Sequence, residues 1–441
     1  MKPARALIPI GTATFGPDTA RRVRTLERQL ITLLSRWGYR EIILPIFEYL
    51  DVLSVGLAPE VLEKCYKFAD WTTGRILVLR PDITAQIARI VAMGMGGAEL
   101  PLRLSYRTTV FRYEPEHAGR ERERFQVGVE LIGTDDASAD AEVVMSLIEL
   151  LKTIGLPDFK VSLGHVGFFQ ALLKKSGLSP SDQRNAAYAV AHKDLPLLEN
   201  LLRQGRLPHK KIHVILEAAG RCGQEDVLEW GRGVAGRDRN LIRPIERLVA
   251  VYALLESAGL KDHILVDLGE FRGFDYYDGV VFDVFTSSLG QEIGGGGRYN
   301  HLLGRFGRDL PSTGFALDMD RVFASLDHTG LFPNEHAASI LLMASQKQFG
   351  AAYRLAQRLR REDMPVIQEM VSVGTASRLK EHANDRLKNV GASTAILLGG
   401  GRSPESAILI RRTASQKNPR HVTVRVEDVP AILKEGAYAR L

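Results

Sequence analysis

Polar side chains interrupt the segment FRYEPEHAGRERERFQVGVELIG, residues 111–133, where strand-like sequence would otherwise be apolar. The segment predicts two strands joined by a charged turn at 115–124. Alternation places Arg112 on one face of the first strand, and Gln126 and Glu130 on a single face of the returning strand. Inward-facing polar groups are costly unless they bind one another or a ligand. A solvated antiparallel face is an equally open interpretation of this segment alone.

Three further segments carry groups that an amino-acid ligand needs. Carboxylates can hold an ammonium group, an arginine can hold a carboxylate, and tyrosines can flank a ring. Arginines at strand ends also suit a triphosphate, and glycine runs let a backbone approach a ligand closely. The segments are LRPDITA at 79–85 with Asp82 and Thr84, RGFDYYDG at 272–279 with Arg272, Tyr276 and Tyr277, and the glycine run 294–297, which follows a strand and is itself followed by Arg298, Tyr299 and GFALDMDR at 314–321.

The elements around these segments predict an α+β core with an antiparallel sheet. Apolar residues at helical spacing predict a helix over 17–37. The remaining pattern predicts strands at 41–45, 75–80, 264–267 and 279–285, helices at 84–95 and 137–154, and a strand leading into a helix over 312–326.

Two regions differ from this core. Residues 165–260 contain amphipathic helices with few strand signals and predict a mostly helical insertion. From 336 to 441 strands and helices alternate, which predicts a C-terminal α/β domain. The predicted domains are therefore a core formed by 1–164 and 261–330, the insertion, and the C-terminal domain, with a linker near 331–335.

Composition narrows the class of protein. The chain has 441 residues, 45% of them hydrophobic and 25% charged, as in an ordinary globular protein. No apolar stretch reaches the ~20 residues of a membrane span, and the N-terminus lacks the apolar core of a signal peptide. With only Cys65 and Cys222, neither a disulfide framework nor a cysteine zinc site is expected. These features predict a cytoplasmic protein without a membrane partner.

Charge is unevenly distributed. Residues 336–441 hold 17 basic and 9 acidic residues, a surplus of +8, whereas the rest holds 41 basic and 43 acidic residues. A basic domain suits a polyanion such as tRNA or an acidic protein, and an ordinary solvated basic surface is the alternative. No metal-binding pattern is present, and His165 and His192 are interpreted as structural.

The four polar segments, in this order, resemble the class II aminoacyl-tRNA synthetase core, and in detail histidyl-tRNA synthetase. The hairpin resembles motif 2 of that family, RGFDYY its histidine signature, and GGRY followed by GFALDMDR its motif 3. The resemblance covers roughly residues 8–328. It implies a class II synthetase-like antiparallel sheet with flanking helices, and it extends weakly to the C-terminal domain, which resembles a degenerate anticodon-binding domain.

A second family resembles the chain more closely, the regulatory subunits of short-form ATP phosphoribosyltransferase. They favour LRPDxTxQIAR, and this chain has LRPDITAQIAR at 79–89. LGHVGFFQALL at 163–173 and AHKDLPLLENLL at 191–202 also resemble that family. Two departures from the synthetases point the same way. Arg124 stands where the synthetases stack adenine on an aromatic ring, and Asp318 replaces a glycine near the triphosphate, which a carboxylate repels unless a metal intervenes.

The resemblance implies a histidine pocket without adenylate chemistry. Asp82, Thr84 and Gln126 are expected at the α-ammonium, although Asp82 is one methylene shorter than the synthetase glutamate. Glu130 and Tyr276 are expected at the imidazole, Arg272 at the carboxylate, with Arg112 nearby and Tyr277 lining the pocket. A relic pocket that binds nothing is the alternative.

The expected function is that of a non-catalytic regulatory subunit in the first step of histidine biosynthesis. Its implied partners are the short catalytic subunit, L-histidine as effector, and a second copy in a homodimeric core within a hetero-oligomer, with tRNA not expected. No metal or cofactor of its own is expected. The alternative is a histidyl-tRNA synthetase, which would use ATP and Mg and Arg272 as its catalytic residue.

Overall fold

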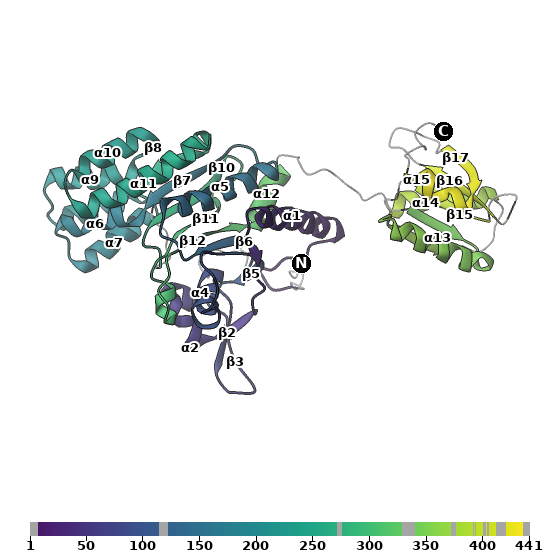
Figure 1. Ribbon diagram of the computed structural model, residues 1–441, viewed down its shortest axis with the longest axis horizontal. Helices are drawn as coiled ribbons and strands as arrows, with labels where there is room; N and C mark the ends of the chain where they lie inside the picture. The colour runs from purple at the N-terminus through teal and green to yellow at the C-terminus, as the bar shows by residue number, and fades with distance from the viewer. Residues whose placement is uncertain are drawn as a thin grey trace, which may run out of the picture. The chain divides into compact units, whose positions relative to one another are not determined.

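The computed structural model describes residues 8–113, 122–270, 276–328, 340–371, 376–390, 392, 394–399, 403, 405–411 and 420–434. The chain divides into two compact units, residues 1–332 and 333–441, and each is described by itself (Figure 1).

A nine-stranded sheet forms the centre of the first unit. The six strands in the middle of the sheet pair antiparallel with their neighbours. On each side of them, the next strand of the sheet pairs parallel. The predicted α+β architecture with an antiparallel sheet is therefore confirmed. The order is β1 (Arg40–Glu41), β5 (Leu102–Phe111), β6 (Glu123–Ile132), β12 (Ser312–Asp318), β11 (Glu292–Arg298), β10 (Val280–Thr286), β7 (Phe159–His165), β9 (Ile264–Asp267) and β8 (Cys222–Gly223).

The glycine run 294–297 is a correction to the sequence interpretation, which placed it after a strand. It lies inside strand β11, between β10 and β12. The strands are packed so closely that a Cβ on Gly296 would lie 1.9 Å from the carbonyl oxygen of Gly314 on β12. Glycine is required here because any side chain would collide with the neighbouring backbone.

Helices α1 (Pro17–Arg36) and α5 (Ala137–Thr153) pack against each other and against the sheet, as Figure 1 shows. α1 turns Leu26, Leu30 and Leu34 into the core, the periodicity that predicted the helix. The strand expected over 41–45 is only two residues long. After it, Ile42 still donates its backbone N–H to Ser105, and Pro45, which has no N–H, follows.

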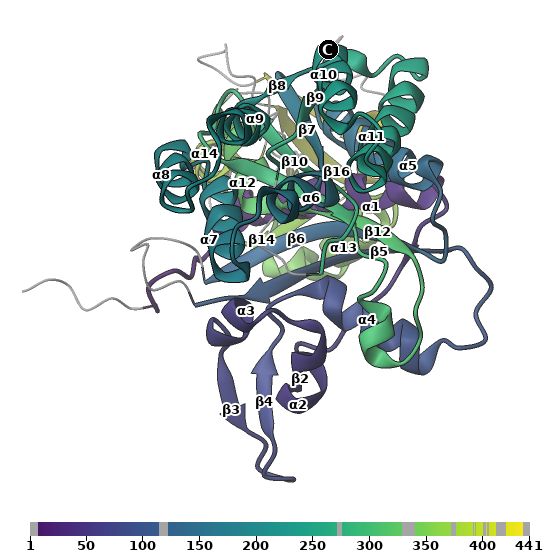
Figure 2. The same ribbon diagram turned by 90° about the vertical axis from the view of Figure 1, so that its left-hand side faces the viewer.

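A smaller layer holds one side of the site. It contains α4 (Ile83–Gly94) and a three-stranded antiparallel sheet, which project together from the main sheet in Figure 2. The sheet has the order β2 (Phe47–Tyr49), β4 (Ile76–Leu79) and β3 (Lys67–Ala69), and the short helices α2 (Leu50–Leu53) and α3 (Pro59–Glu63) lie between its strands in the sequence. Helix α12 (Met319–His328) instead packs against the main sheet.

Residues 165–260 are mostly helical and share the core of the sheet. Leu198 and Leu248 of this segment belong to the same buried cluster as Val129 and Phe282. The two-residue strand β8 pairs with β9 and joins the segment to the sheet. Its helices are α6 (Val166–Ser176), α7 (Pro180–Ala191), α8 (Leu195–Gln204), α9 (His209–Gly220), α10 (Glu225–Ala235) and α11 (Arg239–Ser257).

The second unit is a five-stranded mixed sheet with helices. Its order is β14 (Val366–Met370), β13 (Ile340–Ala344), β15 (Thr394–Leu398), β16 (Ser406–Arg411) and β17 (Arg420–Arg425), with α13 (Phe349–Arg361), α14 (Ala376–Val390) and α15 (Val429–Lys434). Strand β16 was not predicted from the sequence. Across the described residues of both units, none of the helices combines the length and apolarity needed to cross a membrane.

Candidate functional site

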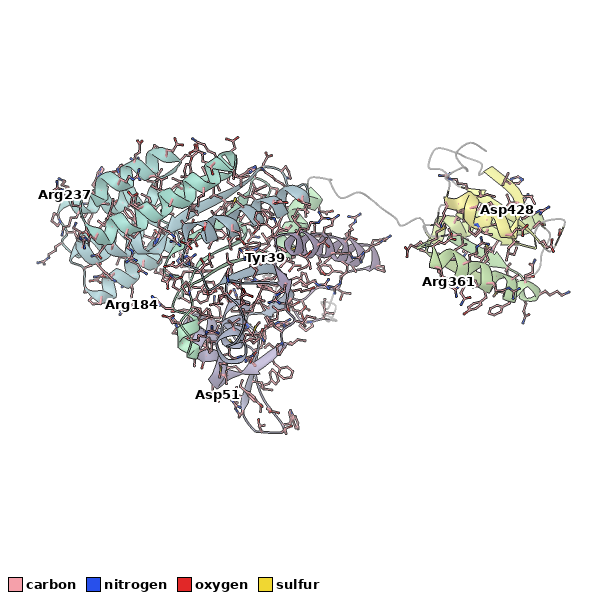
Figure 3. All side chains as sticks on the ribbon, viewed as in Figure 1. Tyr39, Asp51, Arg184, Arg237, Arg361 and Asp428 are labelled. Carbon is pink, nitrogen blue, oxygen red and sulfur yellow. The ribbon has the colours of Figure 1, made fainter. Side chains whose placement is uncertain are left out.

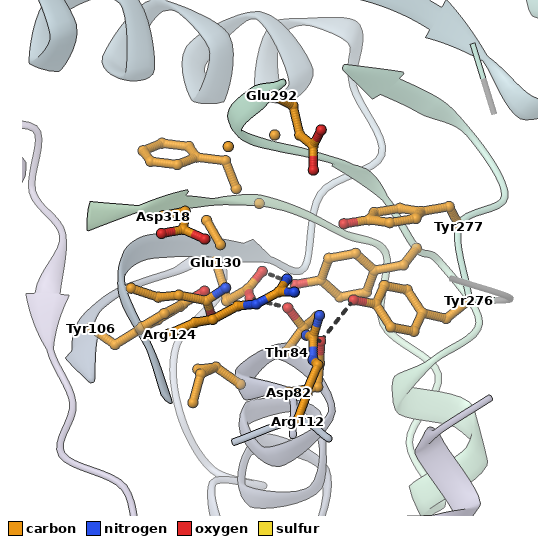
Figure 4. A pocket seen from close by; sticks show the side chains of 18 of the residues that line it. Asp82, Thr84, Tyr106, Arg112, Arg124, Glu130, Tyr276, Tyr277, Glu292 and Asp318 are labelled. Atoms are coloured by element: carbon orange, nitrogen blue, oxygen red, sulfur yellow. Dashed lines mark hydrogen bonds and ion pairs between the residues drawn. The ribbon is translucent and has the colours of Figure 1, made fainter. Parts of the chain in front are cut away.

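A pocket of about 130 Å³ opens between α4, the hairpin β5–β6, and strands β11 and β12 (Figure 4). That volume is on the scale of a small molecule such as an amino acid. Seven of the eight predicted ligand residues line it, although they come from three separate segments: Asp82, Thr84, Arg112, Gln126, Glu130, Tyr276 and Tyr277. The eighth, Arg272, lies outside the described residues.

Asp82 is held in place by its role as the N-cap of α4. One carboxylate oxygen accepts the backbone N–H of Ala85 at 2.8 Å, which satisfies a helix-end donor. The other oxygen accepts the hydroxyl of Tyr276 at 3.3 Å and lies 3.7 Å from the guanidinium of Arg112. Arg112 in turn donates to the carbonyl of Pro81 at 2.6 Å. Asp82 is therefore a fixed, buried carboxylate on the pocket wall.

Glu130 is the most deeply buried carboxyl in the pocket, with 1% of its surface exposed. Its two oxygens accept the hydroxyls of Thr84, at 2.7 Å, and Tyr299. Burial raises the pKa of Glu130 to about 8, and the two hydroxyl hydrogen bonds only partly oppose this. These surroundings favour a neutral Glu130 near pH 7, and a cation or strong donor beside it would favour the carboxylate.

Two tyrosines hydrogen-bond to the two deepest carboxyl groups of the pocket. The hydroxyl of Tyr276, which is expected with Glu130 at the imidazole, donates to Asp82, and that of Tyr299 donates to Glu130. Tyr276, Tyr277 and Tyr299 form an aromatic cluster with ring centroids 4.8–6.4 Å apart. These rings give the pocket an aromatic wall, against which a planar ligand group can pack face to face or edge to face.

Sequence reasoning did not assign Tyr106 or Tyr299 to the site. Burial raises the pKa of both hydroxyls well above the usual range, so both are neutral donors. Tyr299 had a usable signal, because it directly follows the glycine strand. For Tyr106 the sequence gives no such signal. In the structure it pairs across the hairpin with Gly128, and a Cβ on that glycine would lie 2.5 Å from the tyrosine hydroxyl.

The carboxyl face of Glu130 is kept open by a glycine on the adjacent strand. Gly314 lies opposite Glu130 in the register of β6 and β12. A Cβ at Gly314 would lie 2.0 Å from a Glu130 oxygen and 2.3 Å from the backbone oxygen of Val129. The glycine in GFALDMDR therefore leaves room for the glutamate side chain inside the sheet.

The outer side of the pocket carries charges of both signs. Arg321 donates to the Glu292 carboxylate at 2.7 Å and lies 3.5 Å from Asp318. Burial raises the pKa of Asp318, and Arg321 and Arg124 oppose that shift. Figure 4 shows Arg124 reaching into the pocket from β6. These arginines face carboxylates of the chain itself, so the positive charge that a triphosphate needs is largely neutralised.

The arrangement suits recognition of a small ligand. It offers the buried carboxyl groups of Asp82, Glu130 and Asp318, hydroxyl donors and an aromatic wall, which together suit a ligand with an ammonium group and a nitrogen-containing ring. Among the described residues, histidine, cysteine, aspartate and glutamate form no cluster of three that could hold a metal ion.

Comparison with known proteins identifies the family. A family model described as histidyl-tRNA synthetase matches residues 11–322. The ATP phosphoribosyltransferase regulatory subunit of Geobacter sulfurreducens is 32% identical over 93% of this chain and 92% of its own. That of Desulforamulus reducens is 35% identical over 89% of this chain and 96% of its own.

Solved structures agree. The chain is 29% identical to an ATP phosphoribosyltransferase regulatory subunit/histidyl-tRNA synthetase from Bacillus halodurans, with a TM-score of 0.76 over 86% of this chain and 97% of the other. Histidyl-tRNA synthetase from Nostoc sp. PCC 7120 gives a TM-score of 0.79 over 98% and 99% of the two chains at 18% identity, which establishes the shared class II fold alone. The chain therefore belongs to the ATP phosphoribosyltransferase regulatory subunits, within the histidyl-tRNA synthetase-like proteins.

Proposed function

We propose that this chain is the non-catalytic regulatory subunit of an ATP phosphoribosyltransferase, which joins ATP to phosphoribosyl pyrophosphate in the first step of histidine biosynthesis. The observation that carries the proposal is the identity of 32–36% to regulatory subunits over 80–93% of the chain. The short catalytic subunit performs the chemistry, and this chain activates it. No metal or cofactor of its own is needed for that role. The place of action is the cytoplasm, in keeping with two free cysteines.

L-Histidine is the proposed effector, bound in the pocket at Glu130. The imidazole would hydrogen-bond to this buried carboxyl, and the ring would lie against the tyrosine side chains. Asp82 and Gln126 would hold the ammonium group, and Arg272 the carboxylate. Feedback then requires histidine to bind one quaternary state more tightly than another.

A homodimeric core is part of the proposal, and exposed apolar side chains support it. On the small sheet β2–β4–β3, Phe47 and Phe68 are about half exposed with ring centroids 6.1 Å apart. Trp71, between β3 and β4, is fully exposed, and Ile43 is 90% exposed. Adjacent exposed aromatic rings such as those of Phe47 and Phe68 are often buried in protein interfaces. Sedimentation should show a dimer, and Phe47→Glu combined with Trp71→Glu should shift it toward monomer.

The function is tested by mixing the chain with a short catalytic subunit. Alone, this chain should catalyse neither histidine-dependent pyrophosphate exchange nor tRNA charging. Together, the two should transfer phosphoribosyl groups faster than the catalytic subunit alone, and histidine should inhibit the mixture. No change in the rate of the catalytic subunit would overturn the proposal.

The synthetase remains the second candidate because its family model matches residues 11–322, and because Arg112 and Arg321 still line the pocket. Robust histidine-dependent pyrophosphate exchange by the purified chain would favour it over the regulatory role. The charge neutralisation around Arg321 and Asp318 is the reason we rank it second.

Glu130→Gln tests the histidine site. Loss of a hydrogen bond to a charged group costs about 1.5–3 kcal/mol, so histidine affinity measured by calorimetry should fall roughly 10- to 150-fold. Glu48→Gln is the matched control, because Glu48 is also buried but pairs with Arg89 outside the pocket. Unchanged affinity in Glu130→Gln would refute the assignment of the imidazole to this carboxyl.

A further inference from the structure

A second and larger hollow, of about 970 Å³, lies in the same unit outside the pocket described above. Its walls are α6 and α11, and its floor is formed where β10 begins and β11 ends, near Gly279 and Arg298. Figure 2 shows the two helices on the face turned toward the viewer. The helices run in opposite directions, since Lys175 at the end of α6 pairs with Asp238 at the start of α11 at 2.9 Å.

The carboxylates lining the hollow all have partners from the protein. Asp238 pairs with Lys175, and Glu246 pairs with Arg232 at 2.8 Å. Asp135 lies within 3.4 Å of Arg247 and Arg298. Asp278 accepts the backbone N–H groups of Asn300 and His301 at 3.1 and 3.2 Å. Three of the four acidic side chains in the lining are therefore paired with a lysine or an arginine, and Asp278 is held by backbone N–H groups.

Several cations in the lining lack such partners. Lys174, Arg239 and Arg243 are exposed and form no ion pair with any residue in the described part of the chain. Arg247 and Arg298 lie deeper, and both are bound to Asp140, at 2.9 and 2.8 Å. The charge that remains after internal pairing is therefore positive, and it is contributed by both helices facing the hollow. Guanidinium and ammonium groups arranged around a concavity are the usual receptors of phosphate.

His165 adds a neutral donor to the same lining. Its Nδ1 accepts the backbone N–H of Gly167 at 3.0 Å and caps α6, so the proton of the neutral ring is on Nε2. Burial, together with the nearby charges of Arg247 and Arg298, lowers the pKa of His165 to about 4. The amide side chains of Gln170, Asn240 and Asn300 also line the hollow and can recognise hydroxyl or base groups.

We propose that the hollow between α6, α11 and the sheet binds a polyphosphate anion of nucleotide size, with Lys174 and Arg243 as its principal cationic contacts. The volume accommodates a nucleotide, and the unpaired charges have the sign and the side-chain chemistry that phosphate requires. This site is separate from the histidine pocket and does not depend on the regulatory role.

Calorimetry on the full-length chain, without histidine or any catalytic partner, tests the proposal with inorganic pyrophosphate and ATP as probes. Both should bind, and Lys174→Ala combined with Arg243→Ala should weaken binding by at least about tenfold, the effect of removing one strong charged contact or more. Arg184→Ala is the control, because Arg184 is an equally exposed arginine on α7, labelled in Figure 3, that does not line the hollow.

The outcomes separate cleanly. Tighter binding of ATP than of pyrophosphate would support the proposal and assign the amide side chains to the base or ribose. Absence of binding by both probes would overturn it, as would equal losses in the double variant and in Arg184→Ala. ATP binding that the double variant leaves intact would place the nucleotide elsewhere and also overturn it. A rise in the pKa of His165 on pyrophosphate binding, followed by NMR, would support the location.

Discussion

Two carboxyl groups, Asp140 and Glu130, are each 1% exposed in the same unit, yet the protein surrounds them differently. Asp140 receives two arginines, Arg247 and Arg298, at 2.9 and 2.8 Å. Glu130 receives two hydroxyls, from Thr84 and Tyr299, and no arginine or lysine hydrogen-bonds to it among the described residues. Burial raises the pKa of both carboxyls, but only at Asp140 do full positive charges oppose it.

The different surroundings of Asp140 and Glu130 suit them to different roles, one in stabilising the fold and one in binding a ligand. A buried carboxylate that is already neutralised by arginines connects elements and offers nothing to a ligand. A buried carboxyl with hydroxyl donors alone has its charged form undersatisfied, so a ligand with a cationic or donating group can stabilise it. Removal of each group should therefore have opposite consequences for stability and for binding.

Asp140→Ala should have the largest effect on stability. It removes the buried carboxylate partner of Arg298, of which only 2% is exposed, and leaves the more exposed Asp135. Removing one member of a buried pair typically costs about 3–5 kcal/mol. Urea denaturation should show this loss in the free energy of unfolding. A loss below about 1 kcal/mol would mean that Asp135, which lies 3.2 Å from Arg298, replaces Asp140.

Glu130 should make the free energy of unfolding depend on pH, which is the second-largest expected effect. Its pKa is about 8 in the folded chain and 4.5 ordinarily, so its contribution is complete below pH 4.5 and is lost as pH rises through 8. The slope between these values is about 1.4 kcal/mol per pH unit. Glu130→Gln should remove this slope in denaturation measured from pH 5 to 8.

Glu270 provides the background for that experiment. Burial also raises its pKa to about 8, so it contributes a slope of the same sign in both proteins. The difference between the wild type and Glu130→Gln therefore isolates the pocket glutamate. Parallel curves for the two proteins would contradict the shifted pKa of Glu130.

Gly314→Ala should have an intermediate effect and break the pocket specifically. Its Cβ would meet a Glu130 oxygen at 2.0 Å and the Val129 backbone at 2.3 Å. Overpacking of this kind costs about 1–3 kcal/mol, and displacement of Glu130 should also abolish histidine binding. Gly233→Ala is a control, because nothing lies within 4 Å of a Cβ there. Normal histidine affinity in Gly314→Ala would show that the Glu130 position is not critical.

Arg232→Ala should have the smallest effect. Arg232 and Glu246 form a two-bonded ion pair at 2.8 and 2.9 Å, but both side chains are nearly half exposed. Solvent screening limits such pairs to about 0–1 kcal/mol. Thermal denaturation should barely change, and a loss comparable with that of Asp140→Ala would mean that burial is not what separates these pairs.

Much of the fold could be predicted because the local pattern agrees with the final structure. The helix expected over 17–37 is α1, and the strand expected at 264–267 is β9. The glycine strand β11 was misplaced because glycine has low strand propensity, and it forms a strand only where neighbouring backbones need its small size. Strand β16 was missed, although it pairs with the strands that precede and follow it in sequence, β15 and β17.

The site was predicted from motifs rather than from patterns. Motif order placed residues from three distant segments in one pocket, and seven of them do line it. The motifs do not predict which hydroxyl hydrogen-bonds to which carboxyl group inside the pocket. Whether Tyr276 or Tyr299 reaches Glu130 depends on how the loop before β10 and the end of β11 are packed, which no local sequence determines.

The ion pair between Asp140 and Arg247 also limits how this protein can be re-engineered. Residues 165–260 look like a module that could be removed or exchanged between relatives. Arg247, which lies in that segment, binds Asp140 outside it, and β8 covers the edge of β9. A shortened chain would keep a buried carboxylate with one counter-ion fewer and an uncovered strand edge that can pair with other chains. A graft at these boundaries should therefore carry its own partners for Asp140 and β9.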